Sequence, residues 1–178
     1  MSDGSTPSGT QVPPPEAGSG ESAGLMDLLL PGAVLSRVSA PTKKQALQML
    51  CEALAEHVGL EGRMVYEAVL LREKLAGTGA GDGVAIPHAR VPGLSRAVAG
   101  FARFDPPHDF DAMDARPADL VFVLLAPEDR GGDHLKALAR IARFMRRAEI
   151  RDKLRNARGV DHLVTLFSAG TPRSDAAA

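Results

Sequence analysis

A histidine at position 88 follows a glycine-rich stretch, GTGAGDGVAIPHAR, that runs from Gly77 to Arg90. Glycines at alternate positions permit positive φ angles and allow backbone N–H groups to turn toward one point and bind an anion. Pro87 fixes its own φ and restricts Ile86 to extended geometry, so His88 leaves the stretch in a defined direction. A neutral imidazole nitrogen is a competent nucleophile toward phosphorus. The stretch predicts a loop that holds His88 beside a phosphoryl group, with a purely structural loop histidine as the alternative.

The same stretch does not fit the common nucleotide-binding motifs. A P-loop needs a lysine followed by serine or threonine after its last glycine, and here Val84 follows Gly83. The dinucleotide pattern G-x-G-x-x-G fails as well, because the sixth position counted from Gly77 is Asp82. We therefore expect neither ATP nor NAD in this loop, and no cofactor.

Arg72 lies near the end of a predicted helix, just before the glycines. Its neighbours three and four positions away are all apolar, so no carboxylate on the same helix is spaced to pair with it. A planar guanidinium suits phosphate oxygens. We expect Arg72 to bind the phosphoryl group, with an ordinary solvated arginine as the alternative.

His134 follows the loop PEDRGGD, where the most apolar predicted strand leads into a helix. We expect Asp133 to cap this helix, which places His134 in its first turn. Sites in open α/β sheets gather at the carboxyl ends of strands, and His88 and His134 both follow such ends. A second imidazole there can donate a hydrogen bond to a phosphoryl oxygen or orient the first. The alternative is a histidine that only hydrogen-bonds to its own loop.

A metal site is a weaker interpretation of the histidines. His108, Asp109 and Asp111 are close in sequence, but no tight ligand pair such as H-x-x-x-H accompanies them. Two prolines precede His108 in a predicted surface turn. We expect no metal, and we expect His57 and His162 to lie on helix surfaces.

The elements that must position these residues alternate between helices and apolar strands. Helices are predicted over 42–59, 62–75, 134–147, 149–156 and 160–167, and strands over 84–86, 97–104 and 118–127. The buried stripe of the second helix is predicted as Met64, Ala68, Leu71 and Leu75, and that of the third as Leu135, Leu138, Ile141, Ala142 and Met145. Strands that are apolar throughout are covered on both faces. The pattern indicates a single α/β domain, with a central sheet sandwiched by helices.

The composition sets limits on domains and partners. The chain has 178 residues, one cysteine and a formal net charge of -1, which suits one domain and gives no bias toward nucleic acid or anionic membrane. No apolar run reaches the roughly 20 residues of a membrane-spanning helix. Cys51 is expected in the core, and a lone cysteine favours a reducing cytoplasm. Residues 1–24 and 171–178 are predicted to be disordered tails around a domain at 25–170.

Basic residues are dense between Lys136 and Arg158, with nine Lys or Arg against two acids. Two basic helices could resemble a DNA-reading pair, but their connection near Ala148 carries no glycine, and the charges fall opposite the apolar stripe. We expect no nucleic-acid binding; a docking face for an acidic protein fits better.

The stretch LREKLAGTGAGDGVAIPHAR resembles the phosphorylation-site signature of enzyme IIA proteins of the bacterial phosphoenolpyruvate-dependent phosphotransferase system, in the fructose, mannitol and nitrogen-regulatory class. The resemblance continues through FDAMDARPADLVFVLLAPEDRGGDHL and covers about residues 25–170. It implies an α/β sandwich with a mixed sheet, in which His88 is phosphorylated, Arg72 lies at the phosphoryl site and His134 is the second histidine. The family usually has glycine after the histidine. Here it is Ala89, whose methyl is expected to narrow the approach or restrict the turn.

The resemblance also implies a reaction and partners. A phosphohistidine on an HPr-like carrier would pass its phosphoryl group to His88, with no nucleotide or metal required. Arg72, His134 and loop N–H groups would stabilise the equatorial oxygens; the loop residues are Thr78, Gly79, Ala80 and Gly81. A chain with no fused carrier domain is most similar to the nitrogen-regulatory type, a cytoplasmic protein that controls target proteins by its phosphorylation state. The alternatives are a fructose- or mannitol-type IIA that serves a IIB protein, and a binding module in which His88 is never phosphorylated.

Overall fold

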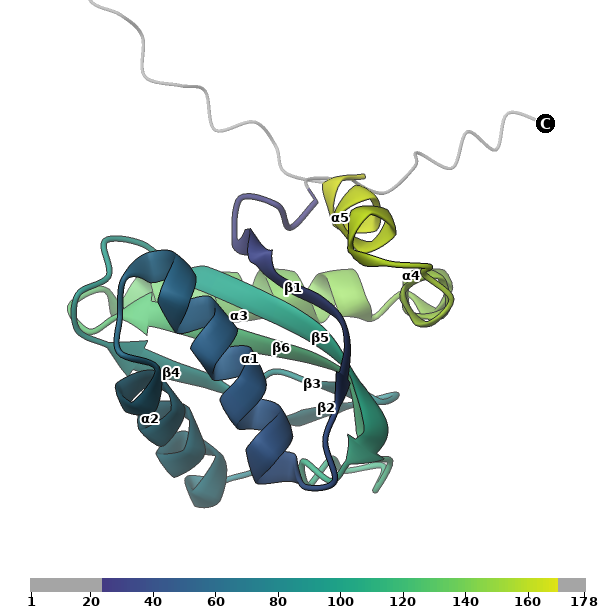
Figure 1. Ribbon diagram of the computed structural model, residues 1–178, viewed down its shortest axis with the longest axis horizontal. Helices are drawn as coiled ribbons and strands as arrows, with labels where there is room; N and C mark the ends of the chain where they lie inside the picture. The colour runs from purple at the N-terminus through teal and green to yellow at the C-terminus, as the bar shows by residue number, and fades with distance from the viewer. Residues whose placement is uncertain (1–23, 170–178) are drawn as a thin grey trace, which may run out of the picture.

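The computed structural model describes residues 24–169, so the tails predicted for residues 1–24 and 171–178 lie outside the described residues apart from Gly24. A six-stranded sheet forms the centre of the fold (Figure 1). Its strands are β1 (Leu29–Ser39), β2 (Gly79–Gly81), β3 (Val84–Ala85), β4 (His88–Val91), β5 (Val98–His108) and β6 (Ala118–Pro127). Their order is β1-β5-β6-β3-β2, and β4 also pairs with β6. Parallel and antiparallel pairs both occur, which confirms the mixed sheet.

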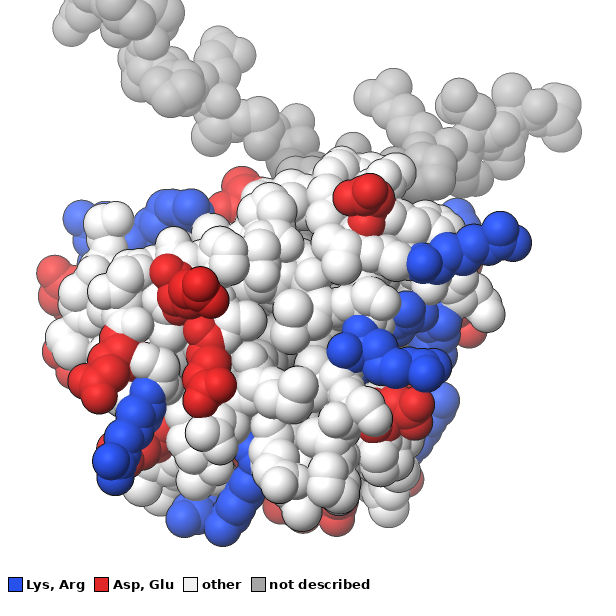
Figure 2. Space-filling model, viewed as in Figure 1, with Lys and Arg blue, Asp and Glu red and all other residues white. Residues whose placement is uncertain are grey.

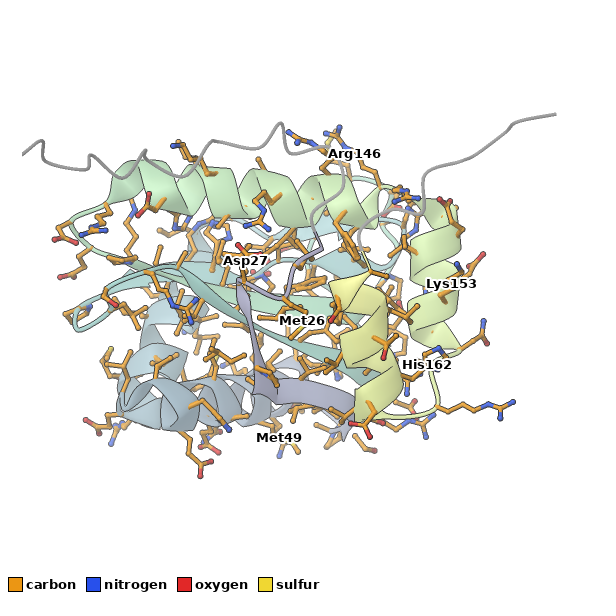
Figure 3. The ribbon with its side chains drawn as sticks, turned by 90° about the horizontal axis from the view of Figure 1, so that it is seen from above. Met26, Asp27, Met49, Arg146, Lys153 and His162 are labelled. Atoms are coloured by element: carbon orange, nitrogen blue, oxygen red, sulfur yellow. The ribbon has the colours of Figure 1, made fainter. Side chains whose placement is uncertain are left out.

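Helices cover both faces of this sheet. They are α1 (Lys43–Val58), α2 (Gly62–Leu75), α3 (Gly131–Met145), α4 (Ala148–Arg155) and α5 (Val160–Ser168). Seen from above, the sheet lies between the layer of α3 and the layer of α1 and α2 (Figure 3). Alternate residues of β6 feed the two cores: Leu124 faces α3, whereas Leu125 enters the core shared with α1. The predicted α/β sandwich is confirmed.

The first helix follows the sequence prediction closely. The Thr42 hydroxyl accepts a hydrogen bond from the Gln45 amide at 3.2 Å, and Gly59 ends the helix with φ of 70°. Cys51 is fully buried, as predicted, and burial raises the pKa of its thiol to about 12. The thiol is therefore protonated and serves as a core residue.

The buried face of α2 differs from the prediction, although its bounds agree. The helix buries Val65, Val69 and Glu73, whereas Met64 and Ala68 are only partly buried. Leu71 and Leu75 are 65% and 77% exposed. The last turn of α2 thus leaves two leucines in solvent, because the face that enters the core is turned by one position.

The third helix begins earlier than predicted. Its first residue is Gly131 and its N-cap residue is Arg130, so Asp133 lies within the first turn and does not cap it. His134 takes an inward position, whereas Leu135 is 65% exposed. The predicted inward face is therefore wrong at Leu135, whereas it is confirmed at Ile141 and Met145, and Leu138 and Ala142 are partly buried against the same core.

The predicted glycine loop is a β-hairpin formed by β2 and β3. Asp82 and Gly83 have φ of 56° and 77°, which suits the tight turn between the two strands. Gly79 is needed for a different reason, because a Cβ there would lie 2.7 Å from the Ala112 Cβ. The glycines thus serve a turn and a close approach of two segments.

Strands β3 and β4 follow one another along the same side of β6. Both run parallel to β6, with Val84 opposite Leu120 and His88 opposite Leu124. The interruption falls at Ile86 and Pro87, and β6 remains attached there because the Leu124 amide donates to the Pro87 carbonyl at 3.0 Å. His88 is therefore the first residue of an edge strand, not part of a loop.

Lysines and arginines alternate with acids over the face formed by α1 and α2, with no field of one sign (Figure 2). Within residues 24–169, no helix is long and apolar enough to span a bilayer.

Candidate functional site

His88 is held in one tautomer by the backbone. Its Nδ1 lies 2.7 Å from the Ile86 carbonyl oxygen, which can only accept, so Nδ1 carries the proton and Nε2 keeps its lone pair. The residue is only 9% exposed. Burial lowers the pKa of His88, with a smaller lowering from the charge of Arg72, and outweighs the raising effect of the Ile86 bond and Glu73. The ring is therefore neutral at pH 7 with Nε2 as a potential nucleophile.

His134 stands directly against His88. The ring centroids are 4.9 Å apart and the ring planes are inclined by 67°. Burial, and then the charges of His88, Arg90 and Arg72, lower the pKa of His134. Its Nδ1 is buried and has no hydrogen-bond partner among the described residues. An unpaired buried nitrogen is costly, so a ligand that bonds to it would be stabilised.

Arg72 lies in the last turn of α2, near enough to the histidine pair for its charge to affect both rings. The sequence indicated no partner for the guanidinium on its own helix. In the structure its Nη1 donates to the Ala76 carbonyl at 2.8 Å, so the guanidinium closes the end of α2 and is not wholly free. Its charge lowers the pKa of both His88 and His134. A guanidinium that acts on both rings is placed to attract an anion between them.

Glu73 is a site residue that the sequence reasoning missed. Its buried carboxylate lies 2.9 Å from Lys43 Nζ and also accepts from the Thr78 hydroxyl. These contacts join the start of α1, the end of α2 and the segment that leads into β2. Glu73 thereby fixes the turn of helix that carries Arg72.

The hairpin does not provide the predicted anion cradle at its first two residues. The Thr78 amide donates to Glu73 at 3.4 Å, and the Gly79 amide donates to the Phe110 carbonyl at 2.9 Å. The turn lies at the opposite end of β3 from His88, where Arg155 Nη2 donates to the Asp82 carbonyl at 2.7 Å. The prediction is wrong for Thr78 and Gly79, whose N–H groups are occupied. For the N–H groups of Ala80 and Gly81 it stays a prediction.

Ala89 does not obstruct the site. Its methyl is buried in the core shared with α1, on the face of the sheet opposite to the His88 ring. It lies within a β-strand, a backbone conformation that alanine adopts without strain. The expected narrowing of the approach is therefore wrong.

Arg90 is a second residue that the sequence reasoning missed. Residues two apart in a strand share a face, so Arg90 and His88 both point toward α3, and this alternation was a usable signal. Its Nη2 lies 3.3 Å from the position that a Cβ on Gly131 would take. Arg90 therefore lies over the first residue of the helix that carries His134.

The remaining histidine of the metal hypothesis lies elsewhere. His108 Nε2 is 3.1 Å from the Ala40 carbonyl oxygen, at the end of β5 remote from His88. Among residues 24–169, no group of three His, Cys, Asp or Glu side chains is arranged to hold a metal ion.

A mixed-sheet α/β sandwich with a buried histidine pair and an arginine at the sheet edge defines a domain of the enzyme IIA class. The chain belongs to the family described as phosphoenolpyruvate-dependent sugar phosphotransferase system, EIIA 2, which matches residues 28–170.

Relatives within this family share most of the chain. A nitrogen regulatory protein of Bradyrhizobium diazoefficiens is 49% identical over 144 residues, which cover 81% of this chain and 94% of that protein. The crystal structure of nitrogen regulatory protein IIA-Ntr from Neisseria meningitidis superposes with a TM-score of 0.73 at 32% identity, over 79% of this chain and 97% of that one. A fructose-specific EIIABC component of Bacillus subtilis is 30% identical over 145 residues, 81% of this chain but 23% of that protein.

Proposed function

We propose that this chain is a phosphoryl-accepting regulatory protein that takes its phosphoryl group on His88 from the phosphohistidine of an HPr-like carrier. Membership of the EIIA 2 family supports a phosphotransferase-system protein. The contact of two buried histidines, with ring centroids 4.9 Å apart, is the observation that carries the choice of His88. The high identity to nitrogen regulatory proteins supports regulation over transport.

The reaction uses the nitrogen that the backbone leaves free. Nε2 of His88 attacks phosphorus in line with the donor nitrogen, so one N–P bond forms as the other breaks, and the donor imidazole keeps the electron pair and takes up a proton. Arg72 and the His134 ring offset the charge on the equatorial oxygens. Because burial keeps the pKa of His88 low, the attacking lone pair is available at pH 7.

A reconstituted phosphorelay tests this function. The chain is incubated with phosphoenolpyruvate, enzyme I and an HPr-type carrier, and the product is mapped by mass spectrometry. We expect one acid-labile, base-stable phosphate on His88. His88→Ala should accept none, whereas His162→Ala, a change on an exposed face of α5, should behave as wild type. A wild-type chain that stays unphosphorylated would favour the binding module.

A second function is supported by the similarity to the fructose-specific component. A transport-type IIA protein passes its phosphoryl group onward to a IIB protein. The phosphorylated chain is therefore mixed with purified fructose- and mannitol-type IIB proteins. Rapid loss of label to IIB supports transport, and retention of label on His88 supports regulation.

Regulation predicts partners that depend on phosphorylation. A phosphoryl group adds nearly two negative charges beside the histidine pair, which changes the charge that any docked protein meets. Proteins captured by wild type, His88→Ala and the phosphorylated form should therefore differ. Identical sets from all three would contradict this proposal.

A further inference from the structure

One cation at the site has no part in the transfer described above. Arg90 extends from the edge strand β4 toward α3, and it makes neither an ion pair nor a hydrogen bond within the described part of the chain. We propose that Arg90 binds the phosphoryl group carried by His88, from the α3 side of the site and opposite Arg72. This inference deepens the proposed function and rests on it.

The sheet register places Arg90 on the required face. His88 pairs with Leu124 and Arg90 with Ala126, and both of these β6 residues belong to the core that faces α3. Arg90 therefore projects on the same side as the His88 ring. The intervening residue, Ala89, points to the opposite core.

The guanidinium of Arg90 lies flat against the start of α3. Its Nη2, Cζ and Nη1 atoms lie 3.3, 3.6 and 3.6 Å from the position that a Cβ on Gly131 would take. Gly131 begins α3, and His134 follows three residues later in the same helix. The missing side chain at Gly131 thus leaves room for Arg90 beside the second histidine.

Among the described residues no acid is paired with Arg90: Asp133, in the first turn of α3, forms no ion pair with it. The N-terminal end of a helix carries partial positive charge, so a guanidinium there is unfavourable unless an anion joins it. Arg72 adds a second positive charge near both rings. Glu73, the acid on the α2 side, is already bound by Lys43. Two guanidiniums and a helix terminus around neutral histidines suit a doubly charged phosphoryl group.

The two arginines affect the pair differently. Arg72 is anchored by the Ala76 carbonyl and its charge affects both histidines, whereas the charge of Arg90 affects His134. Arg90 has no such anchor, so its guanidinium is available to the phosphoryl group once that group is attached. We expect its loss to shift the transfer equilibrium toward the carrier and to speed hydrolysis of phosphorylated His88.

The test compares wild type with Arg90→Gln, Gly131→Ala and Arg143→Gln. Gly131→Ala places a methyl against the guanidinium without removing it, and Arg143 is an exposed arginine of α3 remote from the pair. The phosphorylated fraction at equilibrium with the HPr-type carrier gives the equilibrium constant of transfer. This constant should fall about tenfold in Arg90→Gln, less in Gly131→Ala, and not at all in Arg143→Gln. An unchanged equilibrium constant in Arg90→Gln overturns the proposal.

Two further measurements separate this inference from its premise. Histidine NMR should show that the pKa of His134, but not that of His88, is raised in Arg90→Gln. A general loosening of β4 would change the pKa values of both rings. If the carrier phosphorylates neither wild type nor any variant, the proposed function fails. Inorganic phosphate then replaces the carrier as the probe. Phosphate affinity about tenfold weaker in Arg90→Gln supports the proposal. Equal affinity, or no saturable binding to wild type, overturns it.

Discussion

Two neutral imidazoles in contact are the central feature at the scale of single residues. Burial favours the uncharged form of both His88 and His134, and the positive charges of nearby arginines act in the same direction. The Ile86 carbonyl then decides which nitrogen of His88 bears the proton. The proposed nucleophile is thus kept neutral, and its own backbone fixes which of its nitrogens is free.

The lowered histidine pKa values predict acid sensitivity of folding. In the unfolded chain both histidines have a pKa of about 6.5, whereas in the folded protein both pKa values are lower. Their contribution to stability is complete above that value and is lost as the pH falls through the folded pKa values, because the unfolded state then binds more protons. The free energy of unfolding in urea should therefore decrease between about pH 7 and pH 5.

A double variant isolates this effect. His88→Gln with His134→Gln should flatten the pH dependence of the urea midpoint over that range. His162→Gln leaves both buried rings in place and should retain the wild-type slope. An equal slope in all three proteins would show that the buried pair is not the cause.

Arg72 and His134 are expected to act on the transition state of transfer. Removing one preorganised donor at such a site costs about 3 kcal/mol, or roughly a hundredfold in rate. Arg72→Ala and His134→Ala should each slow transfer from the carrier by about that factor in single-turnover assays, while circular dichroism stays unchanged. Wild-type rates in both variants would remove these residues from the mechanism.

At the scale of elements, the site depends on how three segments meet. The end of α2 brings Arg72, the first turn of α3 brings His134, and the start of β4 brings His88. Glu73 ties the first of these to α1 through Lys43 at 2.9 Å. The chemistry therefore rests on a junction that only tertiary packing creates.

The sequence predicted the residues of this junction better than its geometry. Local signals were sufficient for α1, where the Thr42 cap and Gly59 stop are both visible, and for β6, which is apolar throughout. They missed β1 and β4, because edge strands carry mixed apolar and polar residues and pair only with a distant segment. Glu73 escaped notice because its partner, Lys43, lies thirty positions away.

The glycines show the same limit. Alternating glycines suggested an anion cradle, but Gly79 is required by Ala112, a residue more than thirty positions later in the chain. Nothing local reveals that contact. His88 and His134 could be paired in advance only because each follows the end of a strand that belongs to one sheet.

The contact at Gly79 leads to a prediction for the hairpin. In Gly79→Ala the new methyl would lie 2.7 Å from the Ala112 Cβ and 2.9 Å from its backbone nitrogen, so β2 or the facing segment must shift. We expect a loss of about 1–3 kcal/mol in the free energy of unfolding. Gly132→Ala is the matched control, since no atom lies within 4 Å of the added methyl and the position is helical. It should be neutral or up to about 1 kcal/mol stabilising, and equal losses in both variants would contradict the packing argument.

At the scale of the whole molecule, much of the predicted basic surface serves the fold. Arg140 binds Asp27 at 2.7 Å, and Arg155 binds Asp119 at 2.8 Å. The Arg151 guanidinium donates to the Met145 carbonyl at 2.8 Å. The two ion pairs reduce the positive charge available to an acidic partner along α3 and α4, so the more informative surface lies around the histidine pair.

That surface carries exposed leucines on both sides of the site. Leu71 and Leu75 flank Arg72 on α2, and Leu135 follows His134 on α3, with exposures of 65%, 77% and 65%. Apolar side chains gathered around a reactive group mark a protein contact. The HPr-like carrier of the proposed function is therefore expected to dock on this rim of leucines.

The docking rim predicts a change in KM without a change in fold. Leu135→Asp places a charge where the carrier should bury an apolar side chain, so KM for the carrier should rise about tenfold while the urea midpoint is unchanged. Met49→Asp is the control: Met49 is 45% exposed on α1, across the molecule from α3 (Figure 3). Its KM should match wild type. A docking contact changes KM and leaves kcat unchanged. A fall in kcat for Leu135→Asp with unchanged KM would therefore indicate that the neighbouring His134 is disturbed, and would contradict a docking contact at Leu135.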